Sequence, residues 1–280
     1  MMQRRWLFIA AGVPAALFLG FIFIILFTPA ESIQGVVYRY LEREGYSFRT
    51  QEFGKVLPLG IKARNLEIAD GRGVLLRADE AVLRLRLLPL LAGKVSFSYR
   101  LGIGGGDIRG DFSPRRGGEL DIAISRLRLE DIPFFLTATG TRVKGDLSAQ
   151  ASFSGIGNNA AGEAQLEVKG AELAGVKIGE MPLPDAAYDT VRGALKVSGG
   201  KADLESATLQ GAGLYARLKG NFPVTTPLDA APLNLTLELM PKPDFLEKQK
   251  FVFLLLAKYL ISPGAYQIPI RGTLAKPAIQ

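Results

Sequence analysis

A period of two in the hydrophobic pattern constrains this chain most. Leucine or another apolar residue alternates with a polar or small one in five separate segments, at 83–87, 120–124, 166–169, 214–219 and 233–239. Side chains on a β-strand point alternately to opposite faces, so each segment predicts a strand with one apolar and one polar face.

Turn signals stand between these strands. Gly, Asn and Asp cluster at 70–71, 116–118, 157–159, 199–200 and 220–221. Strands joined by such short turns form antiparallel meanders, whereas parallel strands need crossover helices that the pattern lacks. The sequence therefore predicts a mainly β protein built on an antiparallel sheet.

Two helices interrupt the strand pattern. Ile33, Val36, Val37, Tyr40 and Leu41 recur at helical spacing, which predicts a short amphipathic helix with Ser32 as N-cap and Gly45 as C′ residue. A second helix is predicted over 244–261, where the stretch 251–257 is apolar all round and indicates burial on several sides.

Many one-sided strands and one late helix leave apolar surface to be covered. The sheet either closes into a sandwich or barrel, or forms an elongated, curved trough whose apolar face holds something else. For the trough, the residues expected to line the groove are Leu83, Leu85, Leu87, Ile122, Ile124, Leu214, Leu218, Leu233, Leu235, Leu237 and Leu239.

The N-terminus predicts a membrane anchor. Residues 6–27 carry no charge, and at about 1.5 Å per residue such a helix crosses a hydrocarbon core of roughly 30 Å. Arg4 and Arg5 precede this run, so residues 1–5 are expected in the cytoplasm and residues 31–280 across the membrane. A cleaved signal peptide is the alternative, although the run is longer than the roughly 7 to 15 residues usual for one.

The composition restricts chemistry. With no His and no Cys, the chain cannot supply imidazole bases, thiolates, a Cys/His zinc site or a His-ligated haem. Carboxylate chemistry remains open in principle, but the closest groupings, Glu130 with Asp131 and Asp185 with Asp189, are expected to be solvated side chains. We therefore predict no enzymatic activity, no catalytic residue, no metal and no cofactor.

The net charge of +7 does not indicate nucleic-acid binding. The cations are scattered, and neither a basic helix nor a basic run interleaved with aromatic residues is present in the sequence. Because the cations are scattered, a solvated surface with an excess of Arg is the favoured interpretation, and contact with anionic lipid headgroups or an acidic partner is the alternative.

Several segments resemble the AsmA-like superfamily of bacterial envelope proteins. An N-terminal series resembles the first module of that superfamily, and later segments resemble its strand-ending patterns. The series comprises 57–61, 65–70, 75–80, 83–87 and 89–93, and the later segments are 143–148, 209–214 and 270–277. Length and the single predicted anchor most resemble the type II secretion system protein N family.

This resemblance implies a periplasmic β-rich domain on a single-pass inner-membrane anchor. It implies a non-enzymatic accessory role in protein export, with other type II secretion components as partners. The alternative function is lipid binding or transfer between the inner and outer membranes, in which phospholipid acyl chains occupy an apolar groove. The resemblance carries over no ligand-binding residue, because its motifs are patterns of Gly, Leu and Pro.

Overall fold

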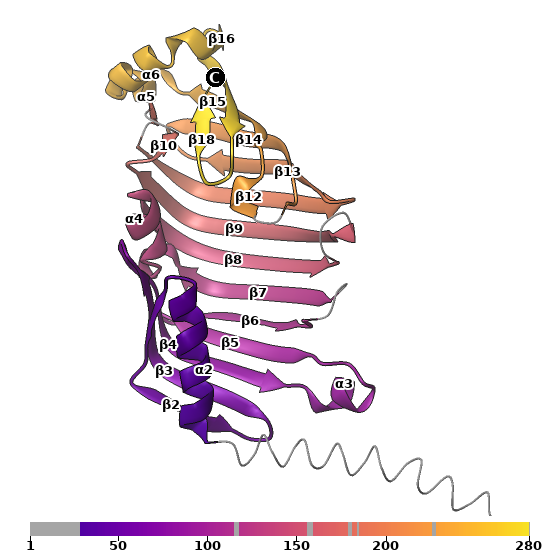
Figure 1. The fold of residues 1–280 in the computed structure, drawn as a ribbon. Coiled ribbons are helices and arrows are strands. Elements are labelled where there is room, and N and C mark those ends of the chain that lie inside the picture. Colours follow the sequence, from indigo (N-terminus) through magenta and orange to yellow (C-terminus); the bar gives the residue numbers. More distant parts are fainter. Residues whose placement is uncertain are drawn as a thin grey trace, which may run out of the picture.

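One antiparallel sheet runs through the protein (Figure 1). The computed structural model describes residues 29–114, 118–155, 159–178, 181–183, 185–225 and 228–279. Within them, 16 strands form a sheet in which most strands pair with the strand before and after them in the chain. These strands are β1 (Ser47–Arg49), β2 (Glu52–Val56), β3 (Gly60–Asp70), β4 (Gly73–Leu85), β5 (Phe97–Ile103), β6 (Gly106–Phe112), β7 (Glu119–Arg128), β8 (Arg142–Ser154), β9 (Ala161–Ala174), β12 (Ala186–Ser198), β13 (Lys201–Gln210), β14 (Leu214–Pro223), β15 (Asn234–Pro241), β16 (Leu260–Ser262), β17 (Ala265–Gly272) and β18 (Pro277–Ile279). Strands β1 and β2 both pair with β3, and β15 pairs with β17.

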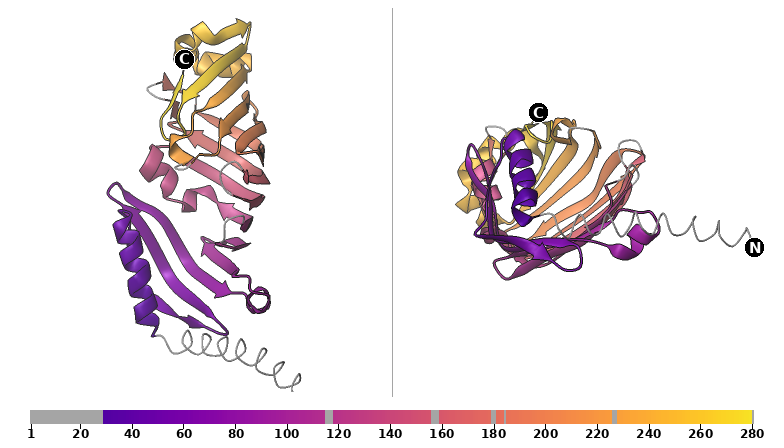
Figure 2. Two further views of the ribbon diagram at one scale, coloured as in Figure 1. Left: turned by 45° about the vertical axis from the view of Figure 1, so that its right-hand side comes forward. Right: turned by 60° about the horizontal axis from the view of Figure 1, so that its bottom comes forward.

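The predicted meander is confirmed, and the sheet stays open. Its path starts at β1 and ends at β16, so among the described strands the two ends do not pair with each other. A separate pair, β10 (Lys177–Ile178) and β11 (Met181–Pro182), lies in the connection after β9. Figure 2 shows that the long strands curve into a trough, with the first helix inside it.

The first helix agrees with its prediction except at its start. Helix α2 (Ala30–Arg43) begins two residues before the expected N-cap Ser32, with Pro29 in the N-cap position. Gly45 follows the helix with φ +85°, the left-handed conformation expected of a C′ residue. Val37 and Leu41 pack on the sheet and fasten the helix to its concave face.

The remaining helices are short. Helix α3 (Leu87–Leu91) follows β4, and α4 (Phe134–Thr139) follows β7 after the 3-10 turn Leu129–Asp131. The prediction of one helix over 244–261 is wrong. The chain bends at Gln249 between α5 (Pro243–Lys248) and α6 (Lys250–Leu255), makes the 3-10 turn Ala257–Tyr259, and pairs as strand β16 from Leu260.

The pairing register places the apolar residues on the concave face. Opposite residues in a ladder point to the same side of the sheet, so a row of partners can be followed across it. One such row is Leu83, Tyr99, Gly110, Ile122, Ala151, Ala164, Leu195, Leu204, Gly220, Leu235 and Ile270. The adjacent row on the convex face begins Val82, Arg100, Arg109, Ala123, Gln150 and Gln165.

Backbone irregularities reverse the alternation near one end of the strands. Asn65 in β3 and Arg126 in β7 have positive φ angles of 48° and 51°, and Gly145 in β8 and Gly170 in β9 have 129° and 60°. The register breaks or skips a pair at each of these positions. Such bulges bend a strand and increase its twist, so they help to turn the edge of the sheet over the trough.

Two main hydrophobic cores lie on this concave face, at opposite ends of the sheet. The N-terminal core comprises Phe48, Ala63, Leu66, Ala78, Ile103 and Leu127, with α2 packed against it. The larger C-terminal core joins β12–β17 to α6 and contains Leu214, Leu256 and Ile268, each at most 1% exposed.

None of the described helices is long and apolar enough to cross a membrane. The predicted anchor 6–27, with Arg4 and Arg5, lies outside the described residues.

Candidate functional site

The predicted groove residues share a face but differ in what covers them. Leu214, Leu233, Leu235, Leu237 and Leu239 are buried in the C-terminal core. Phe253 of α6 and Leu256, which directly follows α6, belong to the same core, so these five leucines lie beneath other side chains and not on an open groove. The expectation that they line a groove is corrected here, because the chain after β15 folds back over them.

Three further candidates are not fully buried in this core and do not lie on an open groove either. Leu218 packs against the edge of the C-terminal core, and Ile124 packs against the N-terminal core. Leu87 is not on the strand with Leu83 and Leu85, since β4 ends at Leu85 and Leu87 opens helix α3. The alternation at 83–87 therefore overstates the strand by two residues.

The other predicted residues, Leu83, Leu85 and Ile122, lie on an open part of the concave face. The strand register places them on the same face of the sheet as Phe97, Phe112, Leu120 and Leu166. Leu120 is 37% and Leu166 is 42% exposed. We call these seven residues the open strip. None of them belongs to a hydrophobic core of the described residues.

Sequence reasoning missed the aromatic part of the open strip. The rings of Phe97 and Phe112 stack with their centroids 5.1 Å apart, across the β5–β6 pair. Phe97, Tyr99 and Leu101 alternate with polar or small residues, so a period-two signal was present in β5. In the segment 107–112 charged residues alternate with Ile108, Gly110 and Phe112, so a weaker period-two signal was present there as well.

An apolar pocket of about 380 Å³ lies at the N-terminal end of the open strip. Helix α2, the β2–β3 turn, strands β3 to β5 and the loop around α3 enclose it, and its walls include Ile33, Leu57, Ile61, Leu85, Leu90 and Phe97. We call it the proximal pocket, because Ile33 lies in the first turn of the helix that follows the predicted anchor. Such a lining can hold a hydrocarbon chain and offers almost no polar group to orient a reactive ligand.

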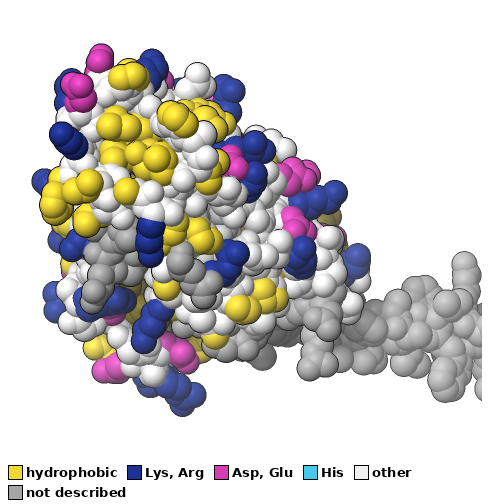
Figure 3. All heavy atoms as spheres, turned by 90° about the horizontal axis from the view of Figure 1, so that it is seen from above, with side chains coloured by type: hydrophobic (Ala, Val, Ile, Leu, Met, Phe, Trp, Pro, Cys, Tyr) yellow, Lys and Arg dark blue, Asp and Glu magenta, His cyan; other side chains and the backbone are white. Residues whose placement is uncertain are grey.

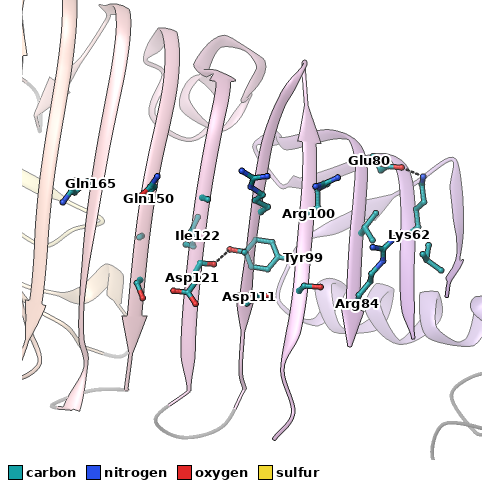
Figure 4. A pocket seen from close by; sticks show the side chains of 18 of the residues that line it. Lys62, Glu80, Arg84, Tyr99, Arg100, Asp111, Asp121, Ile122, Gln150 and Gln165 are labelled. Carbon is teal, nitrogen blue, oxygen red and sulfur yellow. Dashed lines mark hydrogen bonds and ion pairs between the residues drawn. The ribbon is translucent and has the colours of Figure 1, made fainter. Parts of the chain in front are cut away.

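The convex face has a larger hollow, of about 770 Å³, with a different character (Figure 4). Several of its charged side chains pair with one another or with neighbours: Lys62 with Glu80, Arg100 with Asp107 at 3.4 Å, and Arg86 with Asp111 at 3.0 Å. The hydrogen bond from Lys62 is the largest effect that lowers the pKa of the Glu80 carboxyl. Because these charges largely neutralise one another, we regard the smaller apolar pocket as the better candidate site.

The carboxylates singled out in the sequence have structural roles. Glu130 accepts a hydrogen bond from the Gly145 backbone N–H at 3.3 Å, and Asp185 accepts one from the Gly175 N–H at 2.8 Å. Asp131 accepts a hydrogen bond from Arg128 at 2.8 Å. Glu130, Asp185 and Asp189 are nevertheless exposed, as expected of solvated carboxylates, whereas Asp131 is half-buried. The described residues contain no cluster of three or more acidic side chains that could hold a metal ion.

No protein-family model, curated protein or solved structure matches this chain. The fold and the site thus define its class by geometry alone, as an open, curved antiparallel sheet with an apolar concave face.

Proposed function

We propose that this protein binds the acyl chains of lipids along its concave face, without enzymatic activity. The observation that carries this proposal is the continuity of the open strip with the proximal pocket through Leu83, Leu85 and Phe97. Leu120 and Leu166 are exposed and the other five residues of the strip are half-buried. A contiguous apolar surface that is partly open to water typically marks a binding surface. The resemblance to AsmA-like proteins supports the same function.

The energetics of such binding follow from area. Each buried CH₂ group contributes about 0.8 kcal/mol, so six methylenes in the proximal pocket would contribute about 5 kcal/mol. That amount allows a lipid to be held without specific polar contacts. It also predicts low selectivity among acyl chains.

The location of the pocket fits the proposed topology. In this proposal residues 6–27 span the bacterial inner membrane, with Arg4 and Arg5 on the cytoplasmic side and residues 31–280 in the periplasm. Helix α2 begins at Ala30 and its Ile33 lines the proximal pocket. The mouth of the pocket would then lie close to the bilayer from which a lipid enters.

The accessory role in type II secretion remains a prediction from the resemblance. No contact among the described residues singles out a partner protein. Deleting the gene in an organism that has the secretion machine, and measuring export of each substrate, tests that role independently of lipid binding.

Photocrosslinking tests acyl-chain binding directly. A photoreactive amino acid replaces Ile122 on the open strip of the full-length protein, and the adducts formed in cells are analysed by mass spectrometry. We expect phospholipid adducts at Ile122. Ala123 on the convex face is the matched control, and Leu235 in the closed core is a second one. Equal lipid labelling at Ile122 and Ala123, or none at Ile122, contradicts the proposal.

A further inference from the structure

Several hydrophobic side chains at the C-terminal end of the sheet are exposed to solvent and are not packed in the core. Phe251 is 72%, Leu254 67% and Ile261 65% exposed, and Leu255 and Leu260 are exposed beside them in the chain. We call these five residues the tip patch. Figure 3 looks onto this end of the molecule and shows hydrophobic side chains gathered on it, with Lys and Arg and some Asp and Glu side chains around them.

The core beneath the tip patch is already complete. The same segment buries Phe253, Leu256 and Tyr259, and the Phe253 ring lies 6.2 Å from that of Phe245 and 5.2 Å from that of Tyr266, centroid to centroid. The stretch 251–257 was expected to be buried on several sides, and that expectation is wrong. One side is buried, and the opposite side faces solvent.

The charge around the tip patch is predominantly positive. Asp244 and Glu247 of α5 are exposed, but Lys242, Lys248, Lys250 and Lys258 are exposed too and outnumber them. After Glu247 the sequence contains no Asp or Glu, whereas Lys248, Lys250, Lys258, Arg271 and Lys276 follow. Lys250 and Lys258 are exposed and lie within three residues of the tip patch. The Lys258 ammonium lies 4.7 Å from the centroid of the Tyr259 ring.

We propose that the tip patch docks on the surface of an anionic lipid bilayer. A short amphipathic segment with exposed Phe and Leu, flanked by lysines, has the composition of an interfacial membrane contact. The apolar side chains enter the boundary between headgroups and acyl chains, while the lysines reach the phosphates. The excess of lysines over carboxylates in residues 242–258, four against two, favours an anionic surface.

The tip patch lies at the far end of the molecule from α2 (Figure 2). Thirteen inter-strand spacings of about 4.8 Å make the path from β1 to β16 about 60 Å long. A contact at this end is therefore separate from the predicted anchor and from the proximal pocket. The inference stands independently of acyl-chain binding.

Vesicle binding tests the docking. The full-length chain, kept soluble in amphipol, is mixed with vesicles of phosphatidylglycerol and phosphatidylcholine, or with phosphatidylcholine alone, and the bound fraction is measured by flotation. We expect binding to the anionic vesicles, and a loss of at least about tenfold for F251S/L254S, because about two large side chains no longer enter the bilayer. K250E/K258E should abolish the preference for anionic vesicles.

A matched control removes a Phe and a Leu from α4 instead. Phe134 is 45% and Leu136 is 59% exposed, so F134S/L136S changes similar side chains outside the tip patch and should bind like the wild type. Equal binding of F251S/L254S and the wild type overturns the proposal, and so does an equal loss in the control. Concentration-dependent dimers that F251S/L254S abolishes, without any effect on vesicles, would assign the tip patch to a second copy of the chain.

A second readout does not depend on removing apolar side chains. The sequence has no cysteine, so Phe251→Cys takes one environment-sensitive fluorophore and Leu136→Cys provides the reference position. We expect a blue shift on anionic vesicles at position 251 only. No shift at 251 overturns the proposal.

Discussion

The two ends of the sheet carry similar alternating leucines and use them differently. At the N-terminal end, Leu83 and Leu85 line the open proximal pocket, whereas at the C-terminal end Leu235, Leu237 and Leu239 are buried. All five point to the concave face. What differs is the chain that follows. After β15 the polypeptide folds α5 and α6 back over the leucines, whereas after β4 the short helix α3 only borders the pocket.

This difference separates two properties of an alternating pattern: which residues share a face of the sheet, and whether that face is covered by other parts of the chain. Period two decides which residues share a face, because the geometry of the strand is local. Whether that face becomes a core or a binding surface depends on segments that arrive from elsewhere in the chain. Substitutions on the two ends should therefore have opposite consequences for stability and for binding.

The largest expected effect is that of a charge in the closed core. Leu239 is 3% exposed, so Leu239→Asp buries an unpaired carboxylate and should destabilise the protein by at least about 4 kcal/mol. Leu85→Asp, in the open pocket, should leave the fold intact and abolish lipid adducts at Ile122. Circular dichroism melting and photocrosslinking measure the two results. If Leu85→Asp also unfolds the protein, the proximal end is a closed core.

Truncation of apolar side chains should repeat the contrast at smaller magnitude. Ile268 is fully buried, and Ile268→Ala should cost about 2–5 kcal/mol through the cavity that it leaves. Leu166 on the open strip is 42% exposed, and Leu166→Ala should cost about 1 kcal/mol or less. Urea unfolding measures both. Equal losses would show that the open strip is packed in solution.

Alkaline pH should weaken the C-terminal end specifically. Burial raises the pKa of Tyr188 to about 12, above its usual value of 10. Since the unfolded chain loses this proton first, the contribution of neutral Tyr188 is present below pH 10 and declines between pH 10 and about 12, by up to about 2–3 kcal/mol. Tyr188→Phe should remove this part of the pH dependence. A profile unchanged in that variant would contradict the assignment.

The smallest expected effect lies on the convex face of the N-terminal half. The hydrogen bond from Lys62 lowers the pKa of Glu80 below its usual value of 4.5. Ionised Glu80 therefore stabilises the folded state above that value, and the contribution is lost as pH falls through the lowered pKa. Glu80→Gln should flatten the acid limb of the stability curve only slightly, since both side chains are partly exposed to solvent. Acid titration followed by circular dichroism checks this, and a large change would indicate a buried role.

Much of the fold could be predicted from local signals. The strands, the meander and α2 follow from spacing, turns and caps, and Gly45 ends α2 as expected. The reversals of alternation could not be predicted in the same way. Gly145 and Gly170 carry a weak signal as glycines within strands, and Asn65 carries one because Asn adopts positive φ more often than most residues, but nothing about the residue type of Arg126 predicts its positive φ. The sequence also could not show which residues of the stretch 251–257 are buried. An apolar residue gives the same signal in the sequence whether or not the tertiary structure has room for it in the core.

By itself, the sequence determined which side chains share a face, since that depends only on the two-residue repeat of a strand. It also determined the exclusion of thiol and imidazole chemistry, through the absence of Cys and His. Only the tertiary structure decided that Leu85 borders a pocket while Leu239 lies in a core, and that Phe251 faces solvent while Phe253 does not. The physical reason is that coverage comes from contacts between segments distant in the chain, which no local pattern encodes.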